Sequence, residues 1–153
     1  MKKIFPILLV AALLCLLAAC GGTKQADFTK VGADMKAKIT NTEMMELSTE
    51  NFMQTYGIDS ADVKQSFAYV DSTGIKGDEI VFFEGKDAAA AKRIKEKLDE
   101  RYKQKEVEMK DYLPEEYAVL KKCSVNQNGN YVSMIVSPQC EELTKIYNAA
   151  VKK

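Results

Sequence analysis

The segment C123-S-V-N-Q-N-G-N-Y-V-S-M-I-V-S137 carries the clearest local signal for the fold. Asn128-Gly129 separates two strand-like runs, and Asn-Gly supplies both positive φ angles of a type I′ hairpin turn. Counting outward from this turn predicts an antiparallel register. It pairs Val125 with Val132 and Cys123 with Met134 on a core-facing side, and Ser124 with Ser133 on the other.

A second hairpin is predicted upstream of this one. Residues 66–71 read as a strand, the two glycines of residues 72–77 indicate a loop, and residues 78–84 read as a second strand. The apolar run of the second strand, residues 80–83, is continuous and does not alternate, so we expect it inside the sheet with both faces covered. The short connection makes the pair antiparallel.

Helical patterns surround the two hairpins. Apolar spacing predicts a helix from Asp27 through Ile39, another from a Thr49 cap to Tyr56 with Gly57 ending it, and a long one from an Asp87 cap to about Met109. The long helix should turn Ala91, Ile94, Leu98 and Tyr102 toward the core. A short helix follows Pro114, and a last helix begins near Cys140; residues 41–48 read as a connector.

This order predicts an α+β fold. The expected domain, residues 27–153, has a four-stranded, mostly antiparallel sheet made of the two hairpins and packed against helices, with two extra helices at its N-terminus.

The N-terminal segment has the features of an export signal. Lys2 and Lys3 precede an uncharged run that ends in Leu17-Ala18-Ala19-Cys20-Gly21. This pattern resembles a bacterial lipobox, in which the cysteine takes a diacylglycerol before cleavage between the positions of Ala19 and Cys20. The run is shorter than the ~20 apolar residues of a membrane-spanning helix. We therefore expect residues 1–19 to be a signal peptide and residues 20–26 to be a lipidated cysteine and short linker.

Composition limits the chemistry open to the chain. Histidine is absent, which excludes Ser-His-Asp and Cys-His catalysis and metal sites built on imidazole. Without residues 1–19, which carry Lys2, Lys3 and no acidic residue, the formal charge is −2, so nothing attracts nucleic acid over long range. The sequence predicts no cofactor, no metal and a monomer.

Two cysteines remain for the domain, because Cys15 lies in the predicted signal peptide and Cys20 is the predicted lipidation site. The hairpin register and the helical stripe independently place Cys123 and Cys140 on the core side of their elements. Three interpretations stay open: a structural disulfide, two buried free thiols, or a reactive pair. The last lacks the Cys-X-X-Cys turn that lowers a thiol pKa.

Two classes of function fit these residues. The first is a non-catalytic module of the cell envelope that binds a protein, cell-wall or small-molecule partner, and Tyr56, Tyr112, Tyr117 and Tyr131 could line its groove. The second is an enzyme or metal-binding protein that relies on carboxylates alone. Its candidate residues flank the first hairpin: Asp71, Asp78, Glu79 and Glu84.

Four short motifs, in this order and spacing, resemble one known family. They are Tyr56-Gly57-Ile58-Asp59, Asp78-Glu79-Ile80-Val81-Phe82, Tyr112-Leu113-Pro114-Glu115 and Gly129-Asn130-Tyr131-Val132. With the lipobox they resemble small lipoproteins of Gram-positive anaerobes that carry a domain of unknown function (DUF4358-like). The likeness covers residues 27–152. It implies a lipid anchor on the extracytoplasmic face of the cell membrane and carries over no catalytic or binding residue.

Overall fold

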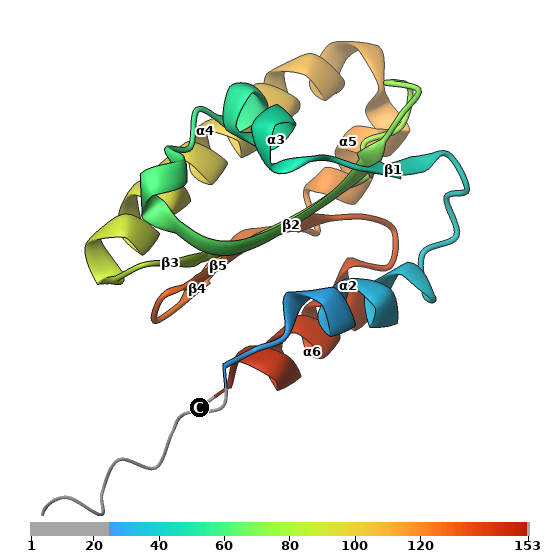
Figure 1. The fold of residues 1–153 in the computed structure, drawn as a ribbon. Coiled ribbons are helices and arrows are strands. Elements are labelled where there is room, and N and C mark those ends of the chain that lie inside the picture. Colours follow the sequence, from blue (N-terminus) through green and yellow to red (C-terminus); the bar gives the residue numbers. More distant parts are fainter. Residues whose placement is uncertain (1–24, 153) are drawn as a thin grey trace, which may run out of the picture.

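A computed structural model describes residues 25–152. A five-stranded antiparallel sheet lies between two layers of helices (Figure 1). The strand order is β1-β2-β3-β5-β4, with β1 at Met44–Glu46, β2 at Val63–Asp71, β3 at Glu79–Gly85, β4 at Val125–Asn128 and β5 at Tyr131–Val136. Both predicted hairpins are present, and β3 is buried along its whole length.

The predicted four strands are one too few. The segment that we expected to be a connector contains β1, which pairs at the sheet edge through Met44↔Asp71 and Glu46↔Tyr69. Strand β1 has only three residues, and its Met45 is exposed. Its sequence therefore lacks the alternation of apolar and polar positions that would indicate a strand. Only the neighbouring strand makes this segment a strand, so its own pattern could not reveal it.

The predicted register of the β4–β5 hairpin is also wrong. Val125 lies opposite Met134 and not opposite Val132. Asn128, predicted to be a turn residue, pairs with Tyr131, so the turn falls on Gly129-Asn130. Gly129 adopts a φ of 58°, which suits the first turn residue. The shift amounts to two residues, and an even shift leaves every side chain on its predicted face.

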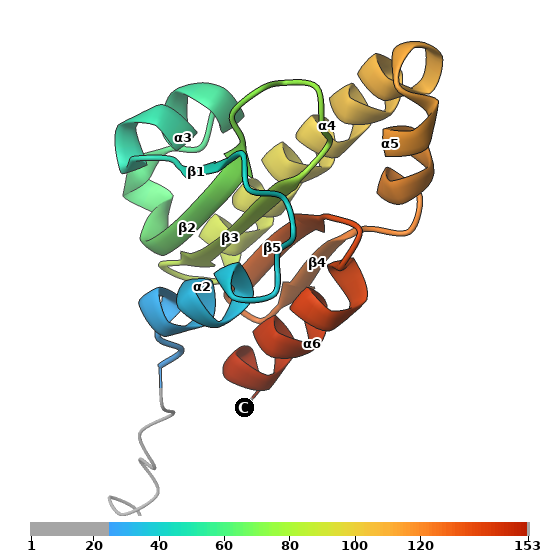
Figure 2. The same ribbon diagram turned by 90° about the vertical axis from the view of Figure 1, so that its right-hand side faces the viewer.

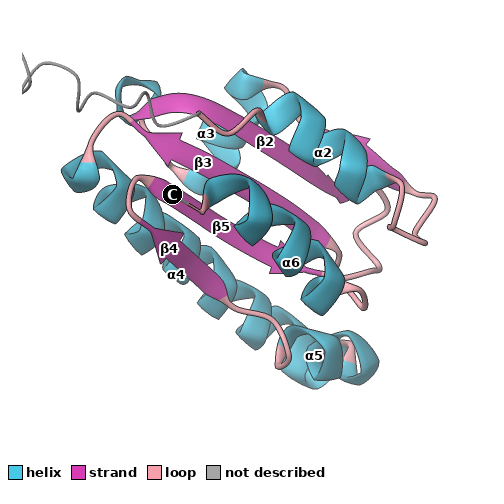
Figure 3. Ribbon diagram, turned by 90° about the horizontal axis from the view of Figure 1, so that it is seen from below, coloured by secondary structure: helices cyan, strands magenta, loops and turns pink. Residues whose placement is uncertain are grey.

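The helices divide between the two faces of the sheet (Figures 2 and 3). Helix α2 (Phe28–Lys36) lies beside α6 (Cys140–Val151) on one face, while α3 (Thr49–Tyr56), α4 (Ala88–Tyr112) and α5 (Pro114–Leu120) lie on the other. The two N-terminal helices are therefore not an extra pair, because the sheet separates them. A short 3₁₀ turn, η1 (Ser60–Asp62), leads into β2.

Helix boundaries follow their caps. The Asp27 side chain caps α2, Asp87 caps α4, and Ser48 rather than Thr49 caps α3. Helix α2 ends at Lys36, three residues before Ile39, and α4 continues past Met109 to Tyr112. No helix in residues 25–152 has the length and apolar character needed to cross a membrane.

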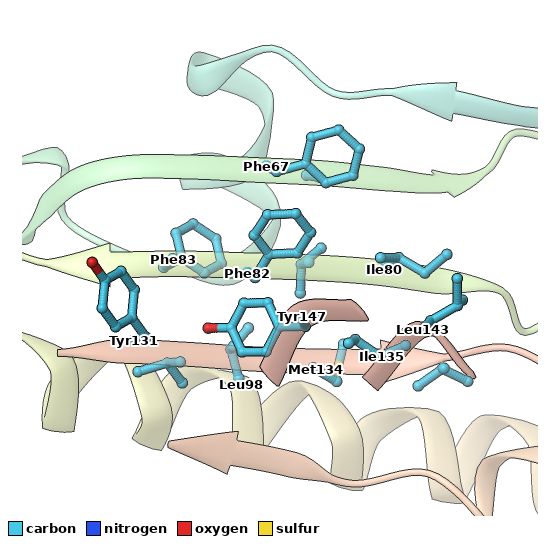
Figure 4. Packing of buried hydrophobic residues seen from close by; sticks show 14 of the residues in the cluster. Phe67, Ile80, Phe82, Phe83, Leu98, Tyr131, Met134, Ile135, Leu143 and Tyr147 are labelled. Carbon is cyan, nitrogen blue, oxygen red and sulfur yellow. The ribbon is translucent and has the colours of Figure 1, made fainter. Parts of the chain in front are cut away.

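An aromatic core fills the space between the sheet and the α2–α6 layer. The Phe82 ring lies 4.8 Å from Phe67 and 5.3 Å from Tyr147, measured between centroids (Figure 4). Helix α2 approaches closely because Gly32 has no side chain, and a Cβ there would lie 2.3 Å from the Phe67 ring. This face of the sheet is accordingly apolar where α2 and α6 cover it.

Candidate functional site

A cleft of about 380 Å³ opens on the other face, between α3, the loop end of the β2–β3 hairpin and α4. Its lining combines apolar side chains, among them Met109 and Leu113, with charged ones. The charged floor consists of Glu79, Arg101 and Lys105, and we call these three residues the floor triad.

Regular structure positions each floor residue. Glu79 begins β3 and faces the same side as Val81 and Phe83, since alternate residues of a strand share a face. Arg101 and Lys105 are four residues apart on α4, so they lie on one side of the helix. Tyr56, the last residue of α3, joins the cleft wall just before Gly57 ends the helix at a φ of 62°.

Hydrogen bonds tie the triad together. Arg101 Nε and Nη2 donate to Glu79 Oε1 and Oε2 at 3.1 and 2.9 Å, and Lys105 Nζ donates to Oε2 at 2.8 Å. Glu79 is 3 % exposed and Lys105 is 4 % exposed, and Lys105 is the sole buried cationic side chain in residues 25–152. Burial by itself would raise the pKa of Glu79, but the hydrogen bonds and charges of Arg101 and Lys105 hold it below its usual range. Glu79 is therefore ionised at neutral pH.

Tyr56 adds a neutral donor beside the triad. Its side chain is buried, and its hydroxyl has no hydrogen-bond partner within the described part of the chain. Burial raises the pKa of Tyr56 far above its ordinary value, and the charge of the nearby Glu79 carboxylate and the approach of the hydroxyl to that carboxylate add to the rise. The phenol remains protonated at any physiological pH and offers an O–H group.

The four predicted carboxylates do not form one site. Asp71 and Asp78 come together at the loop end, where Asn41 Nδ2 lies 3.0 and 3.4 Å from one oxygen of each. Glu84 lies at the opposite end of β3 and accepts hydrogen bonds from Lys64, Gln65 and Gln25. Within residues 25–152, no group of three or more Cys, Asp or Glu side chains could hold a metal ion.

The surroundings of Asp71 and Asp78 shift their pKa values in opposite directions. Asp71 Oδ1 accepts hydrogen bonds from the loop residues Thr73 and Gly74. Burial alone would raise the pKa of Asp71, but these hydrogen bonds and the one from Asn41 lower it. Burial raises the pKa of Asp78, and its Oδ1 lacks a partner among the described residues.

Of the four tyrosines proposed for a groove, Tyr56 alone lines this cleft. Tyr112 is 84 % exposed at the end of α4. Tyr131 packs against Phe28 on the far face of the sheet, and Tyr117 lies beside Lys121 on α5.

The structure holds Cys123 and Cys140 as free, buried thiols. Cys123 Sγ lies 3.3 Å from the Val119 carbonyl oxygen, and Cys140 Sγ lies 3.7 Å from that of Lys122. Burial raises the pKa of Cys123 to about 12, with nearby Cys140 adding to the rise, so the thiol is protonated and a poor nucleophile at neutral pH. A disulfide between them stays a prediction, and thiol counting before and after unfolding of the exported chain measures it.

Sequence reasoning missed Arg101 and Lys105. Extending the apolar stripe of α4 from Leu98 at helical spacing leads to Arg101, Lys105 and Met109. The stripe predicted from the sequence instead continues to Tyr102, which is half-buried and donates its hydroxyl to the Leu120 carbonyl. The sequence did contain a signal for a buried ion pair: two cations at core positions of a helix, and an acidic residue at the start of an apolar strand. The predicted cleavage and lipidation residues, Ala19 and Cys20, lie outside the described residues.

Fold and site define an α+β domain with a charged cleft on one face of its sheet. The family described as "Domain of unknown function (DUF4358)" matches residues 37–137, so the chain belongs to that family. The matched segment contains Tyr56 and the whole floor triad. Neither the curated proteins nor the solved structures gave a match.

Proposed function

We propose that this protein is an extracytoplasmic binding module, anchored to the membrane by lipid on Cys20, that binds a small molecule in the cleft without transforming it. The anchor rests on the lipobox-like sequence that ends at Cys20. Two or more acyl chains, at about 0.8 kcal/mol for each buried methylene, hold a protein stably at a bilayer.

One observation carries the binding role: Tyr56 lines the cleft, and its buried hydroxyl has no hydrogen-bond partner among the described residues. Buried polar groups in folded proteins are nearly always hydrogen-bonded to protein or water, so an unpaired one in a residue that lines a cleft is available to a bound molecule. A cleft of about 380 Å³ is within the usual range for small-molecule sites.

Protonation in the floor favours binding over catalysis. General acid–base catalysis is most efficient when a group has a pKa near the working pH. Here Glu79 is held ionised and Tyr56 is held protonated, so neither exchanges a proton readily near neutral pH.

Ligand screening of the full chain tests the binding role. Small molecules that raise its unfolding temperature should lose at least about fivefold in affinity in Tyr56→Phe, because this variant lacks only the hydroxyl. Tyr112→Phe, which changes an exposed ring, is the matched control. Equal affinity in both variants would show that the ligand does not bind in the cleft.

Palmitate labelling of cells tests the anchor. Wild-type chain should incorporate the label, and Cys20→Ala should not, because the thiol is the acylation site. Cys15→Ala, which changes a cysteine within the proposed signal peptide, is the control and should label normally. Undiminished labelling of Cys20→Ala contradicts the anchor.

A carboxylate-based hydrolase is the second candidate. Asp71 and Asp78 share Asn41, and their environments move their pKa values in opposite directions, as in known acid–base pairs. A hydrolytic activity on chromogenic esters or glycosides that Asp78→Asn abolishes would favour this candidate. An activity that survives the substitution would exclude Asp78 from it.

A further inference from the structure

The floor triad contains more positive than negative charge. Arg101 and Lys105 both pair with the single carboxylate of Glu79, and Tyr56 contributes no charge. Glu108, the remaining carboxylate in ion-pair range of Arg101 among the described residues, lies 3.9 Å from Nη1 and is 63 % exposed. Asp71 and Asp78 also line the cleft, as do Glu108 and Lys76, but neither aspartate forms an ion pair with Arg101 or Lys105 within residues 25–152. The surplus of one positive charge therefore belongs to the largely buried triad and not to the cleft as a whole.

Burying a charge is costly unless an opposite charge and hydrogen bonds accompany it. Most proteins meet this requirement with a partner from the same chain. Within the floor triad one buried anion faces two cations, because Glu108, the second carboxylate near Arg101, is mostly exposed to water. The triad forms the wall of an open cleft, so a second desolvated anion can come from a bound molecule.

Unused donors are present on the same wall. Lys105 Nζ has three N–H groups and makes one hydrogen bond, to Glu79. Arg101 uses Nε and Nη2 for Glu79, while Nη1 makes only the long contact with Glu108. The Tyr56 hydroxyl makes none within the described chain. All three side chains line the cleft.

Building on the proposed binding function, we propose that the cleft binds a small molecule through a carboxylate group. The carboxylate accepts hydrogen bonds from Lys105, Arg101 and Tyr56 and supplies the second negative charge. A singly charged group matches a surplus of one, whereas a phosphate dianion would bring excess negative charge beside Glu79. The apolar body of the molecule lies against Met109 and Leu113.

Titration calorimetry on the full chain, at low ionic strength in a zwitterionic buffer, tests this inference. The probes are butyrate, butanol, butylammonium and inorganic phosphate, of which the first three share one apolar body and differ in charge. Butyrate should bind, with an affinity that falls as sodium chloride is added. The other three should bind at least about tenfold more weakly.

Two variants locate the binding. Lys105→Met removes the surplus charge and should weaken butyrate binding at least about tenfold; Tyr56→Phe keeps the charge and should weaken it about fivefold. Lys103→Met is the matched control, because it removes one exposed charge from the same helix outside the cleft. Each variant is checked for cooperative unfolding first, and Tyr56→Phe keeps the test decisive if Lys105→Met does not fold.

The outcomes separate the two proposals. Binding of butanol or butylammonium that Tyr56→Phe weakens, without binding of butyrate, overturns the carboxylate inference and supports a cleft that binds another class of molecule. Butyrate binding that is equal in wild type, Lys105→Met and Tyr56→Phe overturns the inference as well. If no probe binds, the inference fails, and the separate ligand screen decides whether the binding function fails with it.

Discussion

Two buried glutamates on one strand, Glu79 and Glu84, have different surroundings. Both belong to β3, and neighbouring side chains hold the pKa of each below its usual range against the effect of burial. Glu84 pairs with one cation, Lys64, which is 49 % exposed, and with the amides of Gln65 and Gln25. Glu79 pairs with two cations on the floor of a cleft. A buried carboxylate is therefore not in itself a sign of a site; what distinguishes the proposed site is a surplus of charge beside open space.

The largest effect is expected for Glu79→Gln. This change leaves Arg101 and Lys105 without their shared anion, and breaking a buried ion pair in this way costs about 3 to 5 kcal/mol. Urea unfolding at pH 7 measures the loss of unfolding free energy. A loss below about 1 kcal/mol would mean that both cations reach water, and the contrast between the two glutamates would disappear.

Acid should reduce this contribution of Glu79. Its folded-state pKa lies below the ordinary value of 4.5, so its stabilising effect is complete above about pH 4.5 and is lost as the pH falls through the lowered value. The gap in unfolding free energy between wild type and Glu79→Gln should be constant from pH 7 to pH 5. It should then shrink toward pH 3, and a gap that widens in acid would contradict the assignment.

A smaller effect is expected for Glu84→Gln, about 1 kcal/mol at pH 7. Lys64 is half exposed and can turn to water once its partner is neutral, so no buried charge is left unpaired. The same urea titration, run beside Glu79→Gln, gives the comparison directly. Equal losses at the two positions would show that burial of the acid, and not the cation surplus, determines stability here.

The smallest effect is expected for Lys105→Met, within about 1 kcal/mol of wild type in either direction. The substitution leaves Glu79 and Arg101 as a balanced pair and places an apolar side chain of similar length between Leu98 and Met109 on α4. Thermal and urea unfolding check this expectation. A loss as large as that of Glu79→Gln would show that the triad has no surplus positive charge.

The sequence predicted much of the fold because the main strands carry their own signals. The continuous apolar run of β3 and the Asn-Gly region of the β4–β5 hairpin indicate strands whatever surrounds them. Strand β1 does not, because two of its three residues are exposed and the segment becomes a strand only by pairing with β2. The exact turn residues also depended on the partner strand, which extends the ladder to Asn128.

The candidate site was predictable only in part. Tyr56 and Glu79 were singled out for residue type and position, but Arg101 and Lys105 belong to a lysine-rich helix in which most charges are solvated. Their role depends on which side of α4 lies over Glu79, and that is a property of packing. In the sequence alone, the only sign of this packing is that two cations lie on an otherwise apolar stripe of the helix.

The point where the chain enters the fold has a consequence for orientation. Gln25 Nε2 donates to Glu84 Oε2 at 2.9 Å and Ala26 is buried beside it, so the described chain starts at the Glu84 end of β3. The floor triad begins at the opposite end, and at about 3.3 Å per residue the two ends are roughly 17 Å apart. The proposed lipid on Cys20, five residues before Gln25, would hold the Glu84 end near the bilayer and direct the cleft outward. On that proposal, a molecule that binds in the cleft would arrive from the surrounding medium rather than from the lipid surface.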